Sequence, residues 1–336
     1  MRFALPPGLV PGLLALLPCL TADCPPVGGQ AVMEGVMMRN GDTYGLAVRR
    51  PDGVIRAQRL PWFSLTRHAW LKKPFVRGFP VLLETLVNGI QALNRSVEAA
   101  AQGEEEELSG WHLALSLGLA LVMAVALFVV APHLLSLVML WLHLGGDVEG
   151  LSFHLWDGFF KCCIFMGYIR LISYVPDIRR VFQYHGAEHK TIHAFESGDE
   201  VSAASVARMS RLHPRCGTTF LLFVICISII LHAVLVPLLL MIYTPQSAIA
   251  KHALTIAFKL LLMVPISALA YELIRYAARM PDGFWATLLR APGLALQRLT
   301  TYEPDEAQLD VAVVALREAL GPDAGDNIRT APYTEA

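Results

Sequence analysis

Four apolar segments constrain the fold of this chain more than any other feature. They cover about residues 111–144, 155–175, 218–242 and 252–275. Each approaches or exceeds the roughly 20 residues that an α-helix needs to cross a bilayer. Only 16% of the 336 residues are charged and 55% are hydrophobic, whereas an ordinary soluble domain is about 25% charged. We therefore predict a mostly α-helical, polytopic membrane protein with about four transmembrane helices and a small N-terminal β element.

The first apolar segment is too long for one straight crossing and too short for two. Pro132 lies within it, and proline is a common cause of sharp kinks in helices. We predict one kinked or tilted helix for this segment.

Charged residues occur inside two of the apolar segments. Asp157 and Lys161 lie four residues apart, so their side chains can pair on one face of a helix. Lys259 and Glu272 lie in the last segment. Charges within a membrane are costly and often mark a substrate or ion pathway. Transport is thus one hypothesis, and it requires these four side chains to converge, although the small number of spans and the lack of an internal repeat argue against it.

The distribution of lysine and arginine predicts the orientation of the helices. The loop 144–154 has neither residue and the loop 243–251 has only Lys251, whereas the loop 176–217 contains several arginines. The regions before and after the four segments are also rich in arginine. Four crossings with both termini and the loop 176–217 in the cytoplasm satisfy this pattern.

The regions outside the apolar segments have a soluble character. Alternating apolar residues at Tyr44, Leu46 and Val48 predict a strand, and Arg-Pro-Asp-Gly at 50–53 is typical of a turn. Residues 75–101 have the spacing of an amphipathic helix lying on the membrane or on the rest of the protein. We divide the chain into a disordered or signal-like extension (1–26), a cytoplasmic N-terminal region (27–110), a four-span membrane domain with its cytoplasmic loop (111–277), a cytoplasmic C-terminal region (278–320) and a disordered tail (321–336).

The loop 176–217 contains the motif that most strongly suggests chemistry, His-Gly-Ala-Glu-His. We predict a helix over 179–196, on which His185 and His189 project from one face and can share a metal ion. Glu188 lies beside the pair, where it can act as a general base toward water. The spacing equals the inverzincin motif of certain metallopeptidases. A polar helix face with surface histidines is the alternative.

A second cluster, His-Pro-Arg-Cys, precedes the third apolar segment on the same predicted side. His213 and Cys216 can offer one nitrogen and one sulfur to a single ion. With His185 and His189 they could complete a tetrahedral site for a divalent ion, for which we expect zinc, and Glu196 is a reserve ligand. Four protein ligands would make the site structural, whereas a catalytic site keeps one position for water.

The N-terminal stretch from Gly28 to Arg39 is the other unusual segment. Its glycines permit a close approach of the backbone or a positive φ. Gln30, Glu34 and Arg39 could therefore bind a substrate. The alternative is a turn that leads into a strand, with methionines that fill a core.

Two function classes follow from these motifs. The first is a metal-dependent, hydrolytic membrane protein whose site faces the cytoplasm and whose substrate is a small molecule, a lipid or a peptide. The second is a non-enzymatic membrane scaffold or assembly factor with a structural zinc site. The net charge of −1 excludes nucleic-acid binding through bulk electrostatics. The lipid bilayer is the expected partner, and the sequence is compatible with an oligomer.

Several motifs in the same order resemble the YqhQ-like family of bacterial membrane proteins. The similar stretches are Gly28–Arg39, Tyr184–Ile192, His213–Thr218, and Pro292-Gly293 through Gln297 to Thr300–Pro304. The extension before Val27 differs from the family. The resemblance implies a multi-pass protein of the bacterial inner membrane, of unknown function but predicted to be a metal-dependent enzyme. It also implies a metal site that includes His185, Glu188, His189, His213 and Cys216.

Overall fold

A β-sheet begins the part of the chain that the computed structural model describes, which comprises residues 27–100, 110–198, 200–281 and 283–335. Four antiparallel strands follow one another in chain order: β1 (Gly28–Val32), β2 (Gly35–Asn40), β3 (Thr43–Arg49) and β4 (Ile55–Pro61). The strand expected at 44–48 is confirmed as β3, and the turn at 50–53 leads into β4. The Gly28–Arg39 stretch forms the β1–β2 hairpin.

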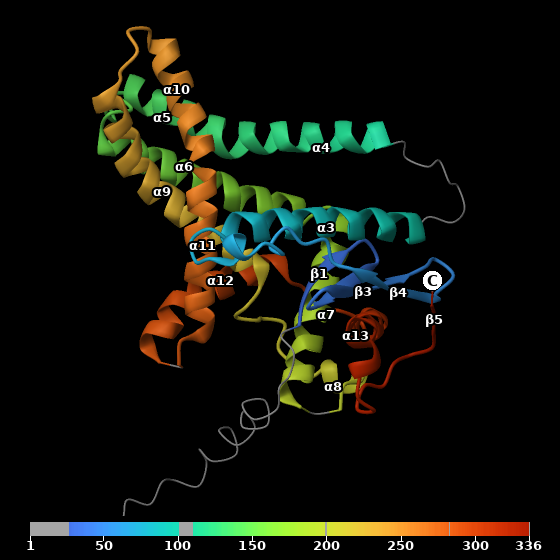
Figure 1. Cartoon of the computed structure of the whole chain (residues 1–336). Coiled ribbons are helices and arrows are strands. Elements are labelled where there is room, and N and C mark those ends of the chain that lie inside the picture. The colour runs from blue at the N-terminus through green and yellow to red at the C-terminus, as the bar shows by residue number, and fades with distance from the viewer. Residues whose placement is uncertain (1–26, 101–109, 199, 282, 336) are drawn as a thin grey trace, which may run out of the picture.

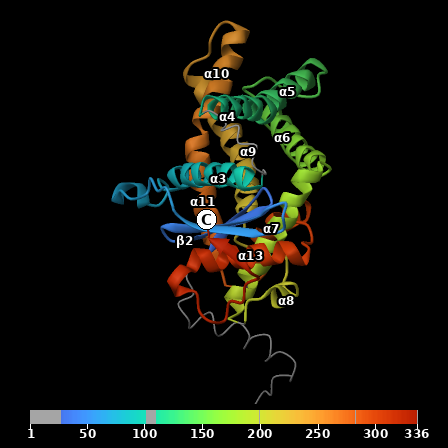
Figure 2. The same cartoon turned by 90° about the vertical axis from the view of Figure 1, so that its right-hand side faces the viewer.

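Alternation along the strands gives the sheet two apolar faces. Val36 and Met38 of β2 pack in one core with α7 (Pro176–Ser197) and α13 (Glu306–Leu320). Met37, between them in the sequence, packs on the opposite face with Ala92 of α3 (Gly78–Ala100). The sheet therefore lies between α3 and α13 (Figure 2). The predicted amphipathic helix thus covers the protein's own sheet, which is one of the two positions expected for it.

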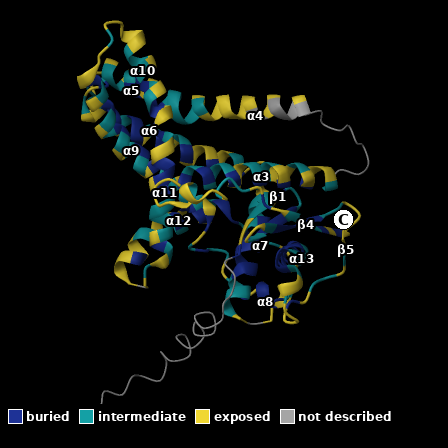
Figure 3. Ribbon diagram, viewed as in Figure 1, coloured by how far each residue is buried: buried dark blue, intermediate teal, exposed yellow. Residues whose placement is uncertain are grey.

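Among the described residues, three helical stretches are long and apolar enough to cross a membrane: Gly118–Trp141, Gly217–Ile242 and Ala248–Arg279. Many of their apolar side chains are exposed on the outside of the bundle (Figure 3). α6 (Leu151–Ile172) meets α7 at a bend of 99°, and it becomes a fourth candidate span if the pair is counted together. The mostly helical fold with a small N-terminal sheet is confirmed, with three to four helices that could span a membrane.

Breaks in regular helix mark two of these spans. The first consists of α4 (Gly110–Val125), a π-helical segment η2 (Ala126–Val130) and α5 (Ala131–Trp141). The π-helical segment ends two residues before Pro132, whose ring cannot fit within a regular helix without displacing the preceding turn. After α9 (Gly217–Ile242), the last span divides at Leu262 into α10 (Ala248–Leu261) and α11 (Met263–Arg279).

Two short 3₁₀ segments and two further helices complete the fold. They are the 3₁₀ segments η1 (Ala69–Lys72) and η3 (Gly321–Asp323), together with α8 (Ala203–Val206) and α12 (Phe284–Thr300). The chain after Gly321, which we expected to be disordered, instead adds β5 (Tyr333–Glu335) in parallel beside β4. That expectation failed because the strand has its partner in the N-terminal region, far away in the sequence. The extension 1–26 lies outside the described residues.

Candidate metal centre

α7 carries the histidine motif at its centre, and local signals define both of its ends. Pro176 occupies the first turn with Asp177 beside it, where a fixed φ and a negative charge both favour a helix start. Gly198 ends the helix with a φ of 76°, the left-handed conformation that glycine adopts readily. Between these ends, His185 and His189 are successive residues of one helix face.

Three potential ligand atoms converge beside this face. His185, His189 and Cys216 each direct one atom to a common place, and these atoms lie within 4.8 Å of one another. Nε2 of His185 is 3.2 Å from Sγ of Cys216. The two imidazole rings are 4.4 Å apart between centroids. Cys216 and His189 are buried, and His185 is half-buried.

Backbone carbonyls orient both imidazoles. Nδ1 of His185 is 2.8 Å from the carbonyl oxygen of Thr300, and Nδ1 of His189 is 2.6 Å from that of Arg211. A carbonyl can only accept a hydrogen bond, so both Nδ1 atoms carry the proton. The Nε2 lone pairs remain available and face the sulfur. Metal-binding histidines are commonly held in this way through their second nitrogen.

Cys216 is placed by the start of α9. It is the N-cap residue of that helix, and its sulfur accepts a hydrogen bond from the amide of Thr218 at 3.4 Å. The hydroxyl of Thr218 lies 3.1 Å from the same sulfur. The N-terminus of a helix favours negative charge, so this position suits a cysteine that acts as a ligand.

The donor set fits a divalent ion such as zinc. Nitrogen and sulfur are the ligands that zinc prefers, and bond lengths of about 2.0–2.3 Å place tetrahedral donors roughly 3.3–3.6 Å apart. The 3.2 Å between His185 and Cys216 is close to that separation. The widest separation, up to 4.8 Å, would require a small side-chain movement. Three donors leave one position of a tetrahedron free.

The other two predicted ligands lie beside this cluster and interact with each other. Nε2 of His213 is 3.5 Å from a carboxylate oxygen of Glu196, whose other oxygen pairs with Arg215. Nδ1 of His213 accepts a hydrogen bond from the amide of Arg215 at 3.3 Å. The His213 ring is 5.8 Å from that of His189 between centroids. The structure thus brings together His185, His189 and Cys216, and leaves His213 and Glu196 as an adjacent pair.

Glu188 is buried against the first strand. It is 5% exposed. Burial raises the pKa of its carboxyl group, and this effect outweighs the lowering of the pKa by the nearby His185 and His213. The amide of Gly29 donates a hydrogen bond to it. A Cβ on Gly29 would lie 2.8 Å from Cγ of Glu188, so the absence of a side chain at Gly29 permits this contact. A carboxyl group with a raised pKa holds a proton more readily than an exposed glutamate does.

The three residues predicted to bind a substrate are separated by the structure. Gln30 approaches α3, where a Cβ on Gly89 would meet its side-chain amide at 2.5 Å. Glu34 lies in the β1–β2 turn and forms a two-pronged ion pair with Arg180 of α7, at 2.5 Å for each contact. The guanidinium group of Arg39 stacks over Trp62 at 4.0 Å. Of the three, Gln30 is nearest in the chain to the contact between Gly29 and Glu188.

Residues from α12 support the site, and the motifs did not single them out as site residues. Gln297 is fully buried. Its side-chain oxygen accepts from the amide of His213 at 2.8 Å, and its nitrogen donates to the carbonyl of the same residue at 2.8 Å. Thr300 supplies the carbonyl that orients His185. The role of a backbone carbonyl cannot be read from the residue type. Gln297 entered the sequence analysis only as part of a stretch that resembles the family.

Comparisons with known proteins show to which family the chain belongs. Residues 73–322 match a family described as "Protein of unknown function (DUF1385)". The "Uncharacterized protein YqhQ" of Bacillus subtilis (strain 168) is 34% identical over 314 residues, which cover 88% of this chain and 92% of that protein. No solved structure matches. The match includes the helices that could span a membrane and the histidine motif, and the chain therefore belongs to the DUF1385 family.

Proposed function

We propose that this chain is a metal-dependent, hydrolytic protein of the bacterial inner membrane, with its site at the cytoplasmic face. The convergence of two Nε2 atoms and one sulfur carries the proposal. His185, His189 and Cys216 come from two elements and meet within 4.8 Å, and backbone carbonyls hold both imidazoles in the tautomer that leaves Nε2 available.

The proposed topology has four crossings and both termini in the cytoplasm. The loops 142–150 and 243–247 lie at the end of the bundle remote from the sheet (Figure 1). They contain no lysine or arginine, and Lys251 just beyond them pairs with Asp147. The arginine-rich loop between α6 and α9 lies at the opposite end, beside the sheet. This charge distribution supports the orientation by the positive-inside rule.

A divalent ion, for which zinc is the expected element, would be held by the three converging residues. Such an ion supplies Lewis acidity and makes water a stronger nucleophile. Three protein ligands are typical of catalytic rather than structural zinc sites. His213 and Glu196 would then orient neighbouring groups, since each already has a partner in the other.

Glu188 would act as the general base. Its burial between α7 and β1 raises its pKa, which brings proton uptake closer to neutral pH. The carboxylate would accept a proton from water and later donate it to the leaving group. Gln30, Glu34 and Arg39 remain the candidates for substrate contacts, with Gln30 adjacent to Gly29 and hence to Glu188. The substrate class would be a small molecule, a lipid or a peptide.

Cobalt substitution of the full chain in detergent tests this proposal. A site with two nitrogens and one sulfur should give a sulfur-to-metal charge-transfer band, which Cys216→Ser abolishes. Added azide should perturb the visible bands if one position is open to small molecules. A spectrum without the sulfur band would overturn the proposed metal site. A spectrum that azide does not change would favour a scaffold with a structural metal over an enzyme.

The role of Glu188 needs a separate variant. Glu188→Gln should bind cobalt as the wild type does and should lose hydrolysis of a panel of activated esters and peptides by the metal-loaded protein. Hydrolysis that survives in this variant would show that Glu188 is not the base, without affecting the metal site.

A further inference from the structure

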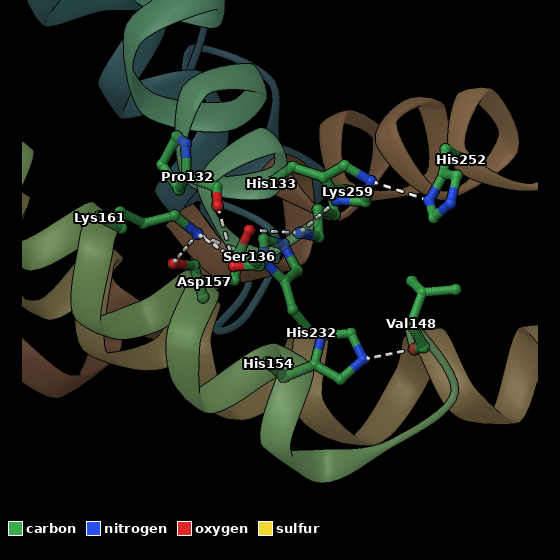
Figure 4. Close-up of polar contacts among 11 residues, drawn as sticks. Pro132, His133, Ser136, Val148, His154, Asp157, Lys161, His232, His252 and Lys259 are labelled. Atoms are coloured by element: carbon green, nitrogen blue, oxygen red, sulfur yellow. Dashed lines mark hydrogen bonds and ion pairs between the residues drawn. The ribbon is translucent and has the colours of Figure 1, made fainter. Parts of the chain in front are cut away.

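A second polar cluster lies inside the helical bundle, away from the metal centre. It contains seven ionisable side chains from α5, α6, α9 and α10: His133, His154, Asp157, Lys161, His232, His252 and Lys259 (Figure 4). Six of them are at most 6% exposed, and only His252 is half-buried. Glu272, the fourth residue required by the transport hypothesis, does not join them, because its carboxylate pairs with Arg77.

The cluster has more positive than negative charge. The ammonium group of Lys259 lies 2.7 Å from one oxygen of Asp157, and that of Lys161 lies 3.5 Å from the other. Lys161 also lies 3.4 Å from the hydroxyl of Ser228 and 3.5 Å from Nδ1 of His232. Two ammonium groups thus face one carboxylate. With neutral imidazoles, the cluster carries one uncompensated positive charge, which is unfavourable in apolar surroundings. The loss of one proton would make the cluster neutral.

A chain of nitrogen atoms leads from this charge toward the surface. Nζ of Lys259 is 3.4 Å from Nδ1 of His133, and Nε2 of His133 is 3.1 Å from Nδ1 of His252. His252 follows Lys251, which pairs with Asp147 and Glu149 at the loop end of the bundle. An imidazole can accept a proton on one nitrogen and release another from the second. The two rings are therefore arranged as a relay.

Two further observations indicate a site rather than a packed core. Nε2 of His232 and Nδ1 of His154 are buried and have no hydrogen-bond partner, although buried polar atoms are nearly always paired. The helices are also irregular here. The π-helical segment Ala126–Val130 ends three residues before His133, and the α10–α11 break at Leu262 follows Lys259 by three residues. Single π-turns occur frequently at functional sites.

We propose that these side chains form a proton-binding site within the membrane that exchanges its proton through His133 and His252 with the face carrying loops 142–150 and 243–247. In the loaded state Asp157 faces two ammonium groups. On release, Lys259 passes a proton to Nδ1 of His133, His133 passes the proton on its Nε2 to Nδ1 of His252, and His252 releases the proton on its Nε2 to water. Lys259 is then a neutral amine, and Asp157 and Lys161 balance each other.

Nitrogen-15 spectra of the full chain in lipid nanodiscs, with labelled lysine side chains, test the site. The chain has six lysines, and Lys259→Met identifies the relevant signal. We expect this signal to change from ammonium to amine as the pH is raised across the range in which the protein stays folded. Asp157→Asn should move the midpoint to lower pH by at least about one unit, a tenfold loss of proton affinity. Asp177→Asn, at an exposed position, is the control.

An ammonium signal for Lys259 at every pH in the wild type would overturn the proposal, and this result does not depend on how any aspartate variant folds. A midpoint that follows chloride concentration at constant pH would overturn it in favour of an anion site. The route has its own test: His252→Leu should preserve the midpoint and slow proton exchange after a pH jump. An unchanged rate would exclude His252 from the route.

Discussion

Nε2 of His185 lies 3.2 Å from Sγ of Cys216, although 31 residues separate the two in the chain. The fold of α7 against α12 and the start of α9 create this proximity. Thr300 at the end of α12 orients the imidazole, and the amide of Thr218 in α9 faces the sulfur. A side chain that is already fixed by a hydrogen bond loses less conformational entropy when it binds an ion. These hydrogen bonds would therefore lower the entropic cost of binding the proposed ion.

Metal content gives the most direct prediction. The purified full chain should carry about one zinc ion, and Cys216→Ser or His185→Ala should reduce this several-fold, because a zinc site with two protein ligands is weak. Cys226→Ser is the matched control, since Cys226 is an exposed cysteine of the same helix α9. Elemental analysis checks the stoichiometry. Equal zinc in the wild type and the Cys216 variant would exclude the sulfur as a ligand.

Gly29→Ala should disturb Glu188 without touching the three converging residues. The new Cβ would lie 2.8 Å from Cγ of Glu188 and 2.8 Å from the carbonyl of Met37. Overpacking of this kind costs about 1–3 kcal/mol, so the thermal midpoint should fall by several degrees while zinc content persists. Gly28→Ala provides the control, because nothing lies within 4 Å of its Cβ. Equal midpoints for the two variants would contradict the described contact.

Glu84 should make the fold sensitive to acid. Burial alone would raise the pKa of Glu84, but hydrogen bonds from Thr66 and Ser64 outweigh it and hold the pKa below its usual range. A lowered folded-state pKa contributes stability above the unfolded value of 4.5, and this stability is lost as pH falls through the folded value.

Glu84→Gln should therefore be less stable than the wild type at pH 7, and the difference should shrink below about pH 4. Thermal unfolding in detergent at several pH values measures it. Glu98→Gln, an exposed substitution on the same helix, controls for net charge. A difference that stays constant with pH would show that ionised Glu84 is not what the hydrogen bonds stabilise.

Arg77 and Glu272 should be coupled energetically. Nε and Nη2 of Arg77 donate to the two carboxylate oxygens of Glu272, at 2.7 and 2.6 Å. Both side chains are largely buried. This pair joins the segment before α3 to α11. We expect a coupling energy of about 1–2 kcal/mol in a double-mutant cycle with Arg77→Ala and Glu272→Ala. Additive effects of the two substitutions would indicate that the pair does not stabilise the docking of α3.

Local patterns in the sequence predicted a substantial part of this structure. The strand at 44–48, the turn after it and the helix at 179–196 all depend on neighbours a few residues away, and that helix, α7, begins three residues earlier than predicted, at Pro176. The i to i+4 contact of Asp157 with Lys161 is equally local, and it is confirmed at 3.5 Å. Spacing along a helix also placed His185 and His189 together, because four residues complete about one turn.

Contacts between distant segments could not be predicted in this way. A linear division separated the N-terminal sheet, α7 and the C-terminal region, yet the structure joins them in one core. The choice of Cys216 over His213 beside the two imidazoles depends on Gln297 and Glu196, which hold His213 from two other elements. The pairing of Glu272 with Arg77, which lies 195 residues away in the chain, is of the same kind.

The sequence by itself determined that the chain contains long apolar helices and that one polar helix between them presents two histidines on one face. Both properties follow from amino-acid composition and from the periodicity of the α-helix. Only the tertiary structure decided which sulfur approaches those histidines, and that Asp157, Lys161 and Lys259 share one buried place. Such encounters depend on how helices pack and where glycines allow close approach, and these properties belong to pairs of distant segments rather than to either segment alone.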